Sequence, residues 1–213
     1  MNFDKNNLLL YAVTDRRWLN GQSLYSRVEE TLKGGATLIQ LREKGLSRQE
    51  FLEEAAQIKT LCHSYGVPLI INDSAETAAA VNADGVHLGQ DDMSPQQARK
   101  ILGEHKIIGV SAHNPQEAKL AQQMGADYLG AGAVFGSSTK TDANLLSHEM
   151  LREICRSVCI PVVAIGGITA ENVTRLQGSG VAGVAVVSAV FAQRETEQAT
   201  RQLKHRLLQI KFN

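Results

Sequence analysis

The segment 37–47, TLIQLREKGLS, runs from an apolar stretch straight into charged residues. Successive side chains of an extended chain point to opposite faces, so Gln40 and Arg42 share a face with Leu38, and Lys44 keeps the same parity. Three long polar side chains therefore converge at one end of a predicted strand. Taken alone, the cluster could be a solvated strand end, because groups of charges usually lie in solvent. The alternative is that it is part of a functional site, which these eleven residues alone favour less.

Acidic residues follow two later apolar runs. Asp73 comes after the run 67–71, and Asp91 and Asp92 come after the run 84–89. On adjacent loops, the carboxylates of Asp73 and Asp92 could face each other across a small gap, and a few hard oxygen ligands shared with phosphate oxygens suit Mg²⁺. By spacing alone Asp91 is an equally good ligand. Asp92 could instead cap the helix that follows it.

Further residues are of types that bind phosphate groups. Lys140 adds a third cation to Arg42 and Lys44, and three cations with a divalent ion would neutralise a diphosphate rather than a monophosphate. Hydroxyl and backbone N–H groups, as anion-binding loops need, come from the neighbouring Ser137, Ser138 and Thr139. In isolation, this hydroxyl segment would be interpreted as an ordinary polar turn.

A second anion site is predicted near the end of the chain. Gly166 and Gly167 close one apolar run, and Val187 and Ser188 close the next. In barrel enzymes, backbone N–H groups after the last two strands frequently hold a phosphate group. Two anion sites, one with a metal and one without, indicate two phosphorylated substrates.

These residues need a scaffold in which apolar runs alternate with amphipathic stretches. Eight strands are predicted, at 8–13, 37–42, 67–71, 84–89, 106–110, 126–132, 161–166 and 181–187. Helix starts are predicted at Ser47 with Glu50, Ser94-Pro95, Asn114-Pro115, Ser147 and Thr169. The alternation predicts an α/β fold, a single-domain (β/α)₈ TIM barrel over residues 1–213. The alternative is an open doubly wound sheet, but no GxGxxG follows the first strand.

The barrel prediction also explains where the unusual residues fall. Functional groups of such barrels lie at the carboxyl ends of the strands. Seven of the eight predicted strands carry a polar or glycine-rich group at that end, among them Asn72, Ser111 and His113. Solvated loops would not be sorted in this way, so the functional interpretation of Gln40, Arg42 and Lys44 is favoured.

Composition limits the other possibilities. Lys plus Arg equals Asp plus Glu at 22 each, which argues against binding nucleic acid or an anionic membrane by bulk charge. The apolar run 8–13 is too short for a signal segment or a membrane span, so a cytoplasmic protein is expected. Cys62, Cys155 and Cys159 form no zinc spacing and are expected to be buried and inert.

Two histidines have no clear catalytic arrangement. His87 lies inside an apolar strand, where a hydrogen-bonded core residue is more common than a catalyst. His113 lies at the functional end of its strand without an obvious carboxylate partner in the sequence. No Ser-His-Asp or Cys-His arrangement is visible, and no lysine lies within an apolar strand as a Schiff-base aldolase would need.

Taken in order, these segments resemble the thiamine phosphate synthase (thiamine-phosphate pyrophosphorylase) family over nearly the whole chain. They are YAVTD, QLREK, IND, DGVHLGQDD, GVSAH, SSTKTD, AIGGI and GVAVVSA. The resemblance implies a (β/α)₈ barrel transferase. It would join 4-amino-2-methyl-5-hydroxymethylpyrimidine diphosphate to 4-methyl-5-(2-hydroxyethyl)thiazole phosphate, or its carboxylated form, releasing diphosphate and leaving thiamine phosphate.

The resemblance also assigns residues. The pyrimidine diphosphate would contact Gln40, Arg42, Lys44, Asn72, Ser111 and Lys140, of which Arg42, Lys44, Ser111 and Lys140 would be catalytic. Mg²⁺ would be held by Asp73 and Asp92 rather than by Asp91. The thiazole phosphate would contact Ser137, Ser138, Thr139, Gly167, Val187 and Ser188. The sequence departs from the family where Gly136-Ser137 replaces the usual Pro-Thr and His113-Asn114 the usual His-Thr.

Two other functions are alternatives to this transferase. A related thiazole tautomerase has a barrel of the same shape but handles no diphosphate, so it would not need the paired aspartates or the cations of QLREK. A non-catalytic barrel that senses thiazole phosphate is the alternative from another class. The intact metal and diphosphate constellation argues against both. Small-molecule substrates are expected, with no nucleic acid or membrane partner, and a homo-oligomer is possible.

Overall fold

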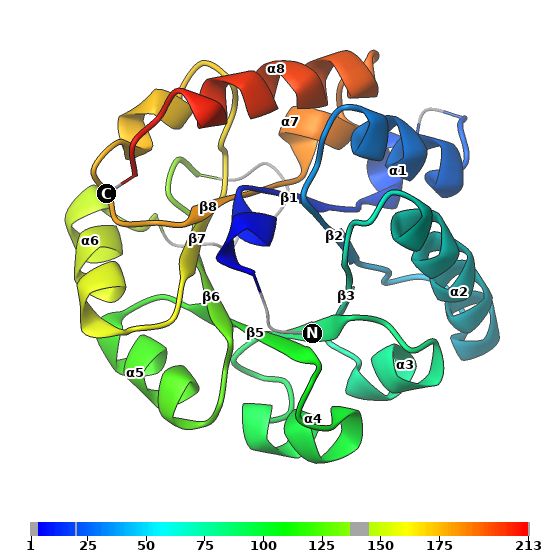
Figure 1. Cartoon of the computed structure of the whole chain (residues 1–213), viewed down its shortest axis with the longest axis horizontal. Coiled ribbons are helices and arrows are strands. Elements are labelled where there is room, and N and C mark those ends of the chain that lie inside the picture. Colours follow the sequence, from blue (N-terminus) through cyan, green and yellow to red (C-terminus); the bar gives the residue numbers. More distant parts are fainter. Residues whose placement is uncertain (1–3, 20, 137–144, 213) are drawn as a thin grey trace.

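A computed structural model describes residues 4–19, 21–136 and 145–212, and within them eight parallel strands close into a barrel (Figure 1). The strands are β1 Leu10–Val13, β2 Leu38–Leu41, β3 Leu69–Asn72, β4 Gly85–Leu88, β5 Ile107–Ala112, β6 Tyr128–Gly132, β7 Val162–Ile165 and β8 Gly183–Val186. Each pairs with the next, and β1 pairs with β8 in the register Tyr11 to Ala185. The predicted barrel is confirmed, and the open doubly wound sheet is wrong.

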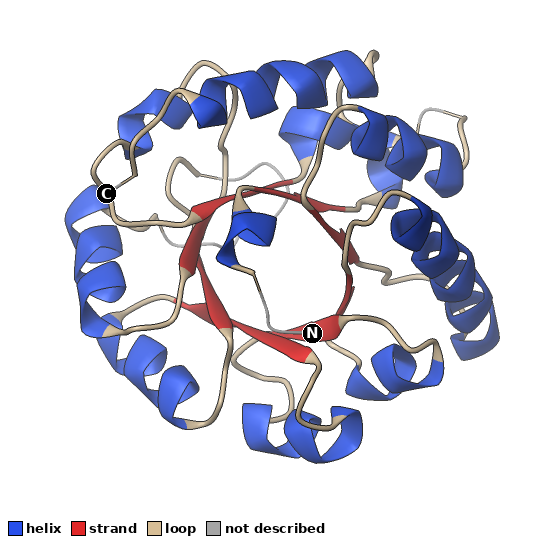
Figure 2. Cartoon of the chain, in the orientation of Figure 1, coloured by secondary structure: helices blue, strands red, loops and turns tan. Residues whose placement is uncertain are grey.

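Helices surround the strands on the outside (Figure 2). They are α1 Leu24–Lys33, α2 Arg48–Ser64, α3 Ala75–Ala80, α4 Pro95–Leu102, α5 Pro115–Gln123, α6 His148–Ser157, α7 Ser188–Phe191 and α8 Thr196–Leu208. Three short 3₁₀ helices are η1 Lys5–Leu8, η2 Arg16–Trp18 and η3 Val173–Leu176. No helix among the described residues is both long and apolar enough to cross a membrane.

Side-chain caps fix where most of the helices begin. The hydroxyl of Ser47 accepts from the N–H of Glu50, whose carboxylate accepts from the N–H of Ser47 in return. Ser94, Asn114 and Ser147 cap α4, α5 and α6 as predicted. Such a cap typically stabilises a helix by about 1 kcal/mol.

The helix predicted to begin at Thr169 does not form. The hydroxyl of Thr169 accepts from the N–H of Glu171, and the N–H of Thr169 donates to the side chain of Asn172. These local bonds hold the chain in a turn, because they compete with helical backbone bonds. Only the single 3₁₀ turn η3 follows.

The first strand is shorter than predicted, since η1 occupies the start of the predicted range 8–13. Asp4 caps η1 by accepting from the N–H of Asn6. Leu8 at its end is fully buried and packs with Tyr11, Leu38 and other residues that point into the barrel. Figure 1 shows η1 lying across the middle of the ring of strands. The N-terminal segment therefore closes one end of the barrel and leaves the other end for a site.

The cysteines only partly match the prediction that all three are buried. Cys62 is buried and Cys155 half-buried, and burial raises the pKa of their thiols to about 12 and about 11. Cys159 is exposed, because α6 ends at Ser157 and the chain crosses the surface before β7. Burial therefore lowers the reactivity of Cys62 and Cys155, whereas it does not protect Cys159.

Candidate active site

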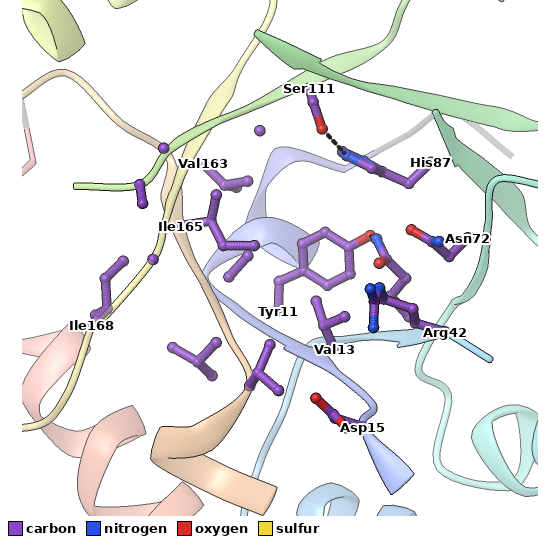
Figure 3. Close-up of a pocket in the computed structure, with 18 of the residues that line it drawn as sticks. Tyr11, Val13, Asp15, Arg42, Asn72, His87, Ser111, Val163, Ile165 and Ile168 are labelled. Atoms are coloured by element: carbon purple, nitrogen blue, oxygen red, sulfur yellow. Dashed lines mark hydrogen bonds between the residues drawn. The ribbon is translucent and has the colours of Figure 1, made fainter. Parts of the chain in front are cut away.

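A cavity that is open to solvent lies at the carboxyl ends of the strands (Figure 3). Seven of the predicted site residues line it: Gln40, Arg42, Asn72, Ser111, Gly167, Val187 and Ser188. Lys44, Asp73 and Asp92 lie outside its lining. The predicted contacts Ser137, Ser138, Thr139 and Lys140 fall outside the described residues. The structure thus brings together groups from β2, β3, β5, β7 and β8.

The side chains of segment 37–47 alternate between the two faces, as predicted, as far as Arg42. Gln40 is buried within β2 and lines the cavity, and Arg42 follows with the same orientation. The N–H of Arg42 donates to the hydroxyl of Thr14 over 2.9 Å, which ties the end of β2 to the end of β1. Lys44 is exposed, because β2 ends at Leu41 and the strand periodicity is lost beyond it.

Glu43 faces the other way and anchors this loop. Its carboxylate accepts from Nε of Arg16 over 2.7 Å, and Arg16 also pairs with Glu54 of α2. The Glu43 side chain is only 3% exposed. Burial raises the pKa of Glu43, and Arg16 partly offsets that rise. In the charged run after β2, Glu43 therefore fixes the loop and Arg42 faces the cavity.

Asp15 was not singled out as a site residue from the sequence, yet its buried carboxylate lines the cavity. Its Oδ2 atom lies 2.6 Å from Nη2 of Arg17. Burial by itself would raise the pKa of Asp15, but hydrogen bonds from Arg17 and the charges of Arg17 and Arg42 lower it overall. The signal in the sequence that points to Asp15 is its position two residues after the end of β1, at the same end of the barrel as the other site residues.

Asp73 and Asp92 come together at the rim, as their spacing predicts. Desolvation, the charge of Asp92 and a side-chain hydrogen bond to Asp92 all raise the pKa of Asp73, while Lys44 and Arg42 act to lower it. Oδ2 of Asp92 accepts from the N–H of Gly89 over 2.7 Å. The alternative that Asp92 caps α4 is wrong, because Ser94 is the cap.

The pair of carboxylates is compatible with Mg²⁺. Two like charges in contact repel each other, and a cation between them would remove that repulsion. Within the described part of the chain, no group of three or more His, Cys, Asp or Glu side chains is placed to hold a metal. Mg²⁺ commonly uses only one or two carboxylates, with water and substrate phosphate completing its shell. Asp73 has φ of 65°, an unusual conformation that Asp adopts more readily than most residues.

The two histidines have defined partners. Nδ1 of His87 lies 2.9 Å from the Tyr128 hydroxyl and Nε2 lies 3.1 Å from the Ser111 hydroxyl, so the prediction of a hydrogen-bonded interior histidine is confirmed. His87 also lines the cavity. His113 has a carboxylate partner after all, since its Nδ1 lies 2.8 Å from Glu117. The Asn114 cap starts α5 there, which places Glu117 beside His113.

Glycines inside two strands make room for this interior. A side chain on Gly109 of β5 would overlap the Tyr128 ring, and one on Gly130 of β6 would come within 3.2 Å of His87. Glycine inside a strand often marks such a close approach. The Tyr128 ring therefore fits because residue 109 has no side chain.

Gly109→Ala is expected to lower the free energy of unfolding by about 2 kcal/mol, because an added methyl in a packed interior forces its neighbours to move. Urea unfolding followed by circular dichroism measures this. Gly45→Ala is the matched control, since no atom lies within 4 Å of the added methyl. Equal stability of the two variants would contradict the packing described for Tyr128.

Comparisons with known proteins identify the family of this chain. The family model described as Thiamine monophosphate synthase matches residues 10–190. The chain is 48% identical over 199 residues to a thiamine-phosphate synthase of Ruminiclostridium cellulolyticum, covering 93% of this chain and 95% of the relative. It is 49% identical to that of Clostridium acetobutylicum, covering 90% and 91%.

Solved structures give the same result. A thiamine phosphate pyrophosphorylase from Pyrococcus furiosus superposes with a TM-score of 0.89 at 40% identity, over 96% of this chain and 98% of that one. KGPDC from Streptococcus mutans, at 12% identity and a TM-score of 0.67, shares the fold alone. The family resemblance of the motifs is thereby confirmed: the chain belongs to the thiamine monophosphate synthase family.

Proposed function

We propose that this protein is a transferase that synthesises thiamine phosphate from a hydroxymethylpyrimidine diphosphate and a thiazole phosphate. The observation that carries the proposal is the convergence of Gln40, Arg42, Asn72 and Ser111 on one cavity, in a chain of this family. Its relatives that are named thiamine-phosphate synthase support the same reaction.

The pyrimidine diphosphate occupies the β2 to β5 side of the mouth in this proposal. The planar guanidinium of Arg42 suits bidentate contact with phosphate oxygens, and Gln40, Asn72 and Ser111 offer hydrogen bonds around it. Lys44 at the rim, and Lys140 by sequence position, would add positive charge around the leaving diphosphate. Catalytic roles fall to Arg42, Lys44, Ser111 and Lys140.

Mg²⁺ fits the proposal at Asp73 and Asp92. The two carboxylates lie beside the loop that carries Arg42 and Lys44, whose charges reach Asp73. When bound, the ion would neutralise charge on the diphosphate. Asp92 would be held in place for this by its hydrogen bond from Gly89.

The thiazole phosphate would lie on the β7 to β8 side. Gly166 and Gly167 have φ of 104° and 63°, conformations that glycine adopts without strain. They line the cavity with Val187 and Ser188, which are in the position where barrels frequently bind phosphate. The sequence-based contacts Ser137, Ser138 and Thr139 would complete this second anion site.

The reaction is proposed to be a dissociative substitution. The bond between the pyrimidine methylene carbon and the diphosphate oxygen breaks first, and its electron pair leaves with diphosphate. The thiazole nitrogen lone pair then forms the new C–N bond to the methylene cation. No proton has to be removed at the reacting atoms, so the protein acts by positioning and charge stabilisation. Trapping a covalent pyrimidine–enzyme adduct during normal turnover would contradict this route.

A product assay tests the function directly. The protein is incubated with both substrates and Mg²⁺, and thiamine phosphate and diphosphate are measured by chromatography. Equal amounts of both products are expected, and none with either substrate alone. Isomerisation of a thiazole phosphate without condensation would favour the tautomerase alternative. Binding of thiazole phosphate without any turnover would favour the sensing barrel.

The proposal extends to the domain organisation, the location and the partners of the protein. Residues 1–213 would form a single barrel domain in the cytoplasm, acting on small molecules without nucleic acid or membrane partners. The repeated strand and helix units that run through to α8 support the single domain. The side chains of Leu120 and Leu208 are exposed, and a homo-oligomer would be able to bury such apolar surface.

A further inference from the structure

Five polar side chains form a continuous hydrogen-bonded chain across the interior of the barrel. The Gln40 amide nitrogen donates to the Tyr11 hydroxyl over 2.5 Å, and the Tyr11 and Tyr128 hydroxyls lie 2.8 Å apart. The chain continues from Tyr128 to Nδ1 of His87 and from Nε2 of His87 to Ser111. Both of its ends, Gln40 and Ser111, line the cavity. Figure 3 shows the His87–Ser111 contact beside Tyr11.

The two phenols in the middle keep their protons. Tyr11 and Tyr128 are 1% and 0% exposed. Burial raises the pKa of both hydroxyls well above its usual value, although hydrogen bonds act to lower that of Tyr11. Each phenol therefore has one proton to donate and lone pairs to accept, so the direction of each bond constrains the next.

The Gln40 amide nitrogen gives these five side chains one direction of donation. Tyr11 accepts from Gln40, so its own proton must go to Tyr128, its other hydrogen-bond partner among the described residues. Tyr128 then accepts from Tyr11, and its own proton is available to Nδ1 of His87. A neutral imidazole that accepts at Nδ1 carries its proton at Nε2, which donates to the Ser111 oxygen.

We propose that Tyr11, Tyr128 and His87 are positioning residues that preset Ser111 as a hydrogen-bond donor and Gln40 as an acceptor toward the substrate. With its oxygen occupied by His87, the Ser111 hydroxyl keeps its proton for the cavity. A donor suits the oxygens of a diphosphate, which only accept. At the other end, the amide oxygen of Gln40 is left to accept. The expected effect on kcat rests on the proposed function. The tautomer of His87 can be measured whether or not that function is correct.

A reversed chain is the competing arrangement. If the Gln40 amide were rotated so that its oxygen faced Tyr11, every bond could run the other way. Nδ1 of His87 would then carry the proton, and Nε2 would accept from Ser111, which would leave no Ser111 proton for the substrate. The tautomer of His87 therefore reports the direction of the whole chain.

Nitrogen-15 NMR of the ligand-free, full-length protein at a pH where His87 is neutral distinguishes the two directions. The His87 signals are assigned by their loss in His87→Gln. We expect a protonated Nε2 and an unprotonated Nδ1 in the unmodified protein, and loss of this fixed preference in Tyr128→Phe. A protonated Nδ1 in the unmodified protein would overturn the proposal, whether or not the protein makes thiamine phosphate.

A double-mutant cycle measures the effect on turnover. Tyr128→Phe is expected to lower kcat about tenfold, because Ser111 no longer offers its proton in a fixed direction. In the Ser111→Ala background the same change should cost clearly less, since one of the two residues it acts through is gone and only the effect on Gln40 remains. An equal loss in both backgrounds would overturn the positioning role. An inactive unmodified protein would refute the proposed function and leave the NMR measurement to decide.

Tyr11→Phe is the matched control, because it removes a hydroxyl from the same chain on the far side of Tyr128. Tyr128 keeps its contact with His87 in this variant, so the Ser111 end is disturbed less than in Tyr128→Phe, whereas Gln40 loses its partner directly. Its loss in kcat should therefore persist in the Ser111→Ala background. Urea unfolding of each variant separates lost stability from lost positioning. Should Tyr128→Phe fail to fold, the tautomer in the unmodified protein still decides.

Discussion

Asp73→Asn and Asp92→Asn are each expected to raise the Mg²⁺ concentration needed for half-maximal activity and to lower kcat roughly a hundredfold. Each change removes one of two adjacent carboxylates while keeping side-chain size. Asn at position 92 can still accept from the N–H of Gly89, and Asn at position 73 tolerates φ of 65°. The loss therefore reports charge rather than loop structure. Initial rates measured across a Mg²⁺ titration give both quantities.

Asp91→Asn supplies the control, because it changes the neighbouring carboxylate on the same exposed loop. It should leave the Mg²⁺ dependence nearly unchanged. An Asp91→Asn variant as impaired as Asp92→Asn would refute the assignment of the metal ligands. So would Asp73→Asn and Asp92→Asn variants with unaltered Mg²⁺ dependence.

Ser188→Glu is expected to raise KM for the thiazole phosphate about a hundredfold and to leave KM for the pyrimidine diphosphate nearly unchanged. Ser188 begins α7 directly after Val187, and it lines the cavity together with Gly167. A carboxylate there would face a phosphate dianion, and repulsion between like charges in a partly desolvated site is strong. Steady-state kinetics with each substrate varied in turn measure the two constants.

Ser188→Gln controls for size, since glutamine has nearly the shape of glutamate without the charge. Its effect on KM for the thiazole phosphate should be much smaller than that of Ser188→Glu. If Ser188→Glu instead raised KM for both substrates equally, the separation of the two anion sites would be wrong. That result would point to one shared phosphate site.

Strand periodicity predicted the barrel because the apolar runs alternate with amphipathic stretches, most of which form helices that begin at a side-chain cap. The eight predicted strands are all present, with ends that differ by a few residues. Parity within β2 also placed Gln40 and Arg42 on the inside, since alternation is a local property of an extended chain. The same alternation predicted Lys44 on the inside, but Lys44 is exposed because β2 ends at Leu41.

Contacts between distant strands could not be predicted in the same way. Alternation could place Tyr11 and Tyr128 inside the barrel, but their 2.8 Å contact depends on strand register and on the space left by Gly109. The Arg16 pairs with Glu43 and Glu54 likewise depend on how α2 packs beside β2. Such arrangements are properties of tertiary packing, and no local pattern encodes them.

The most direct test of the two-site account is a crystal structure with Mn²⁺, diphosphate and thiazole phosphate, with the metal located by anomalous scattering. We expect an anomalous peak between Asp73 and Asp92, in contact with diphosphate oxygens that also approach Arg42. The thiazole phosphate group is expected apart from the metal, at Gly167 and Ser188. A metal bound at Asp91 without Asp73, or both anions in one place, would contradict it.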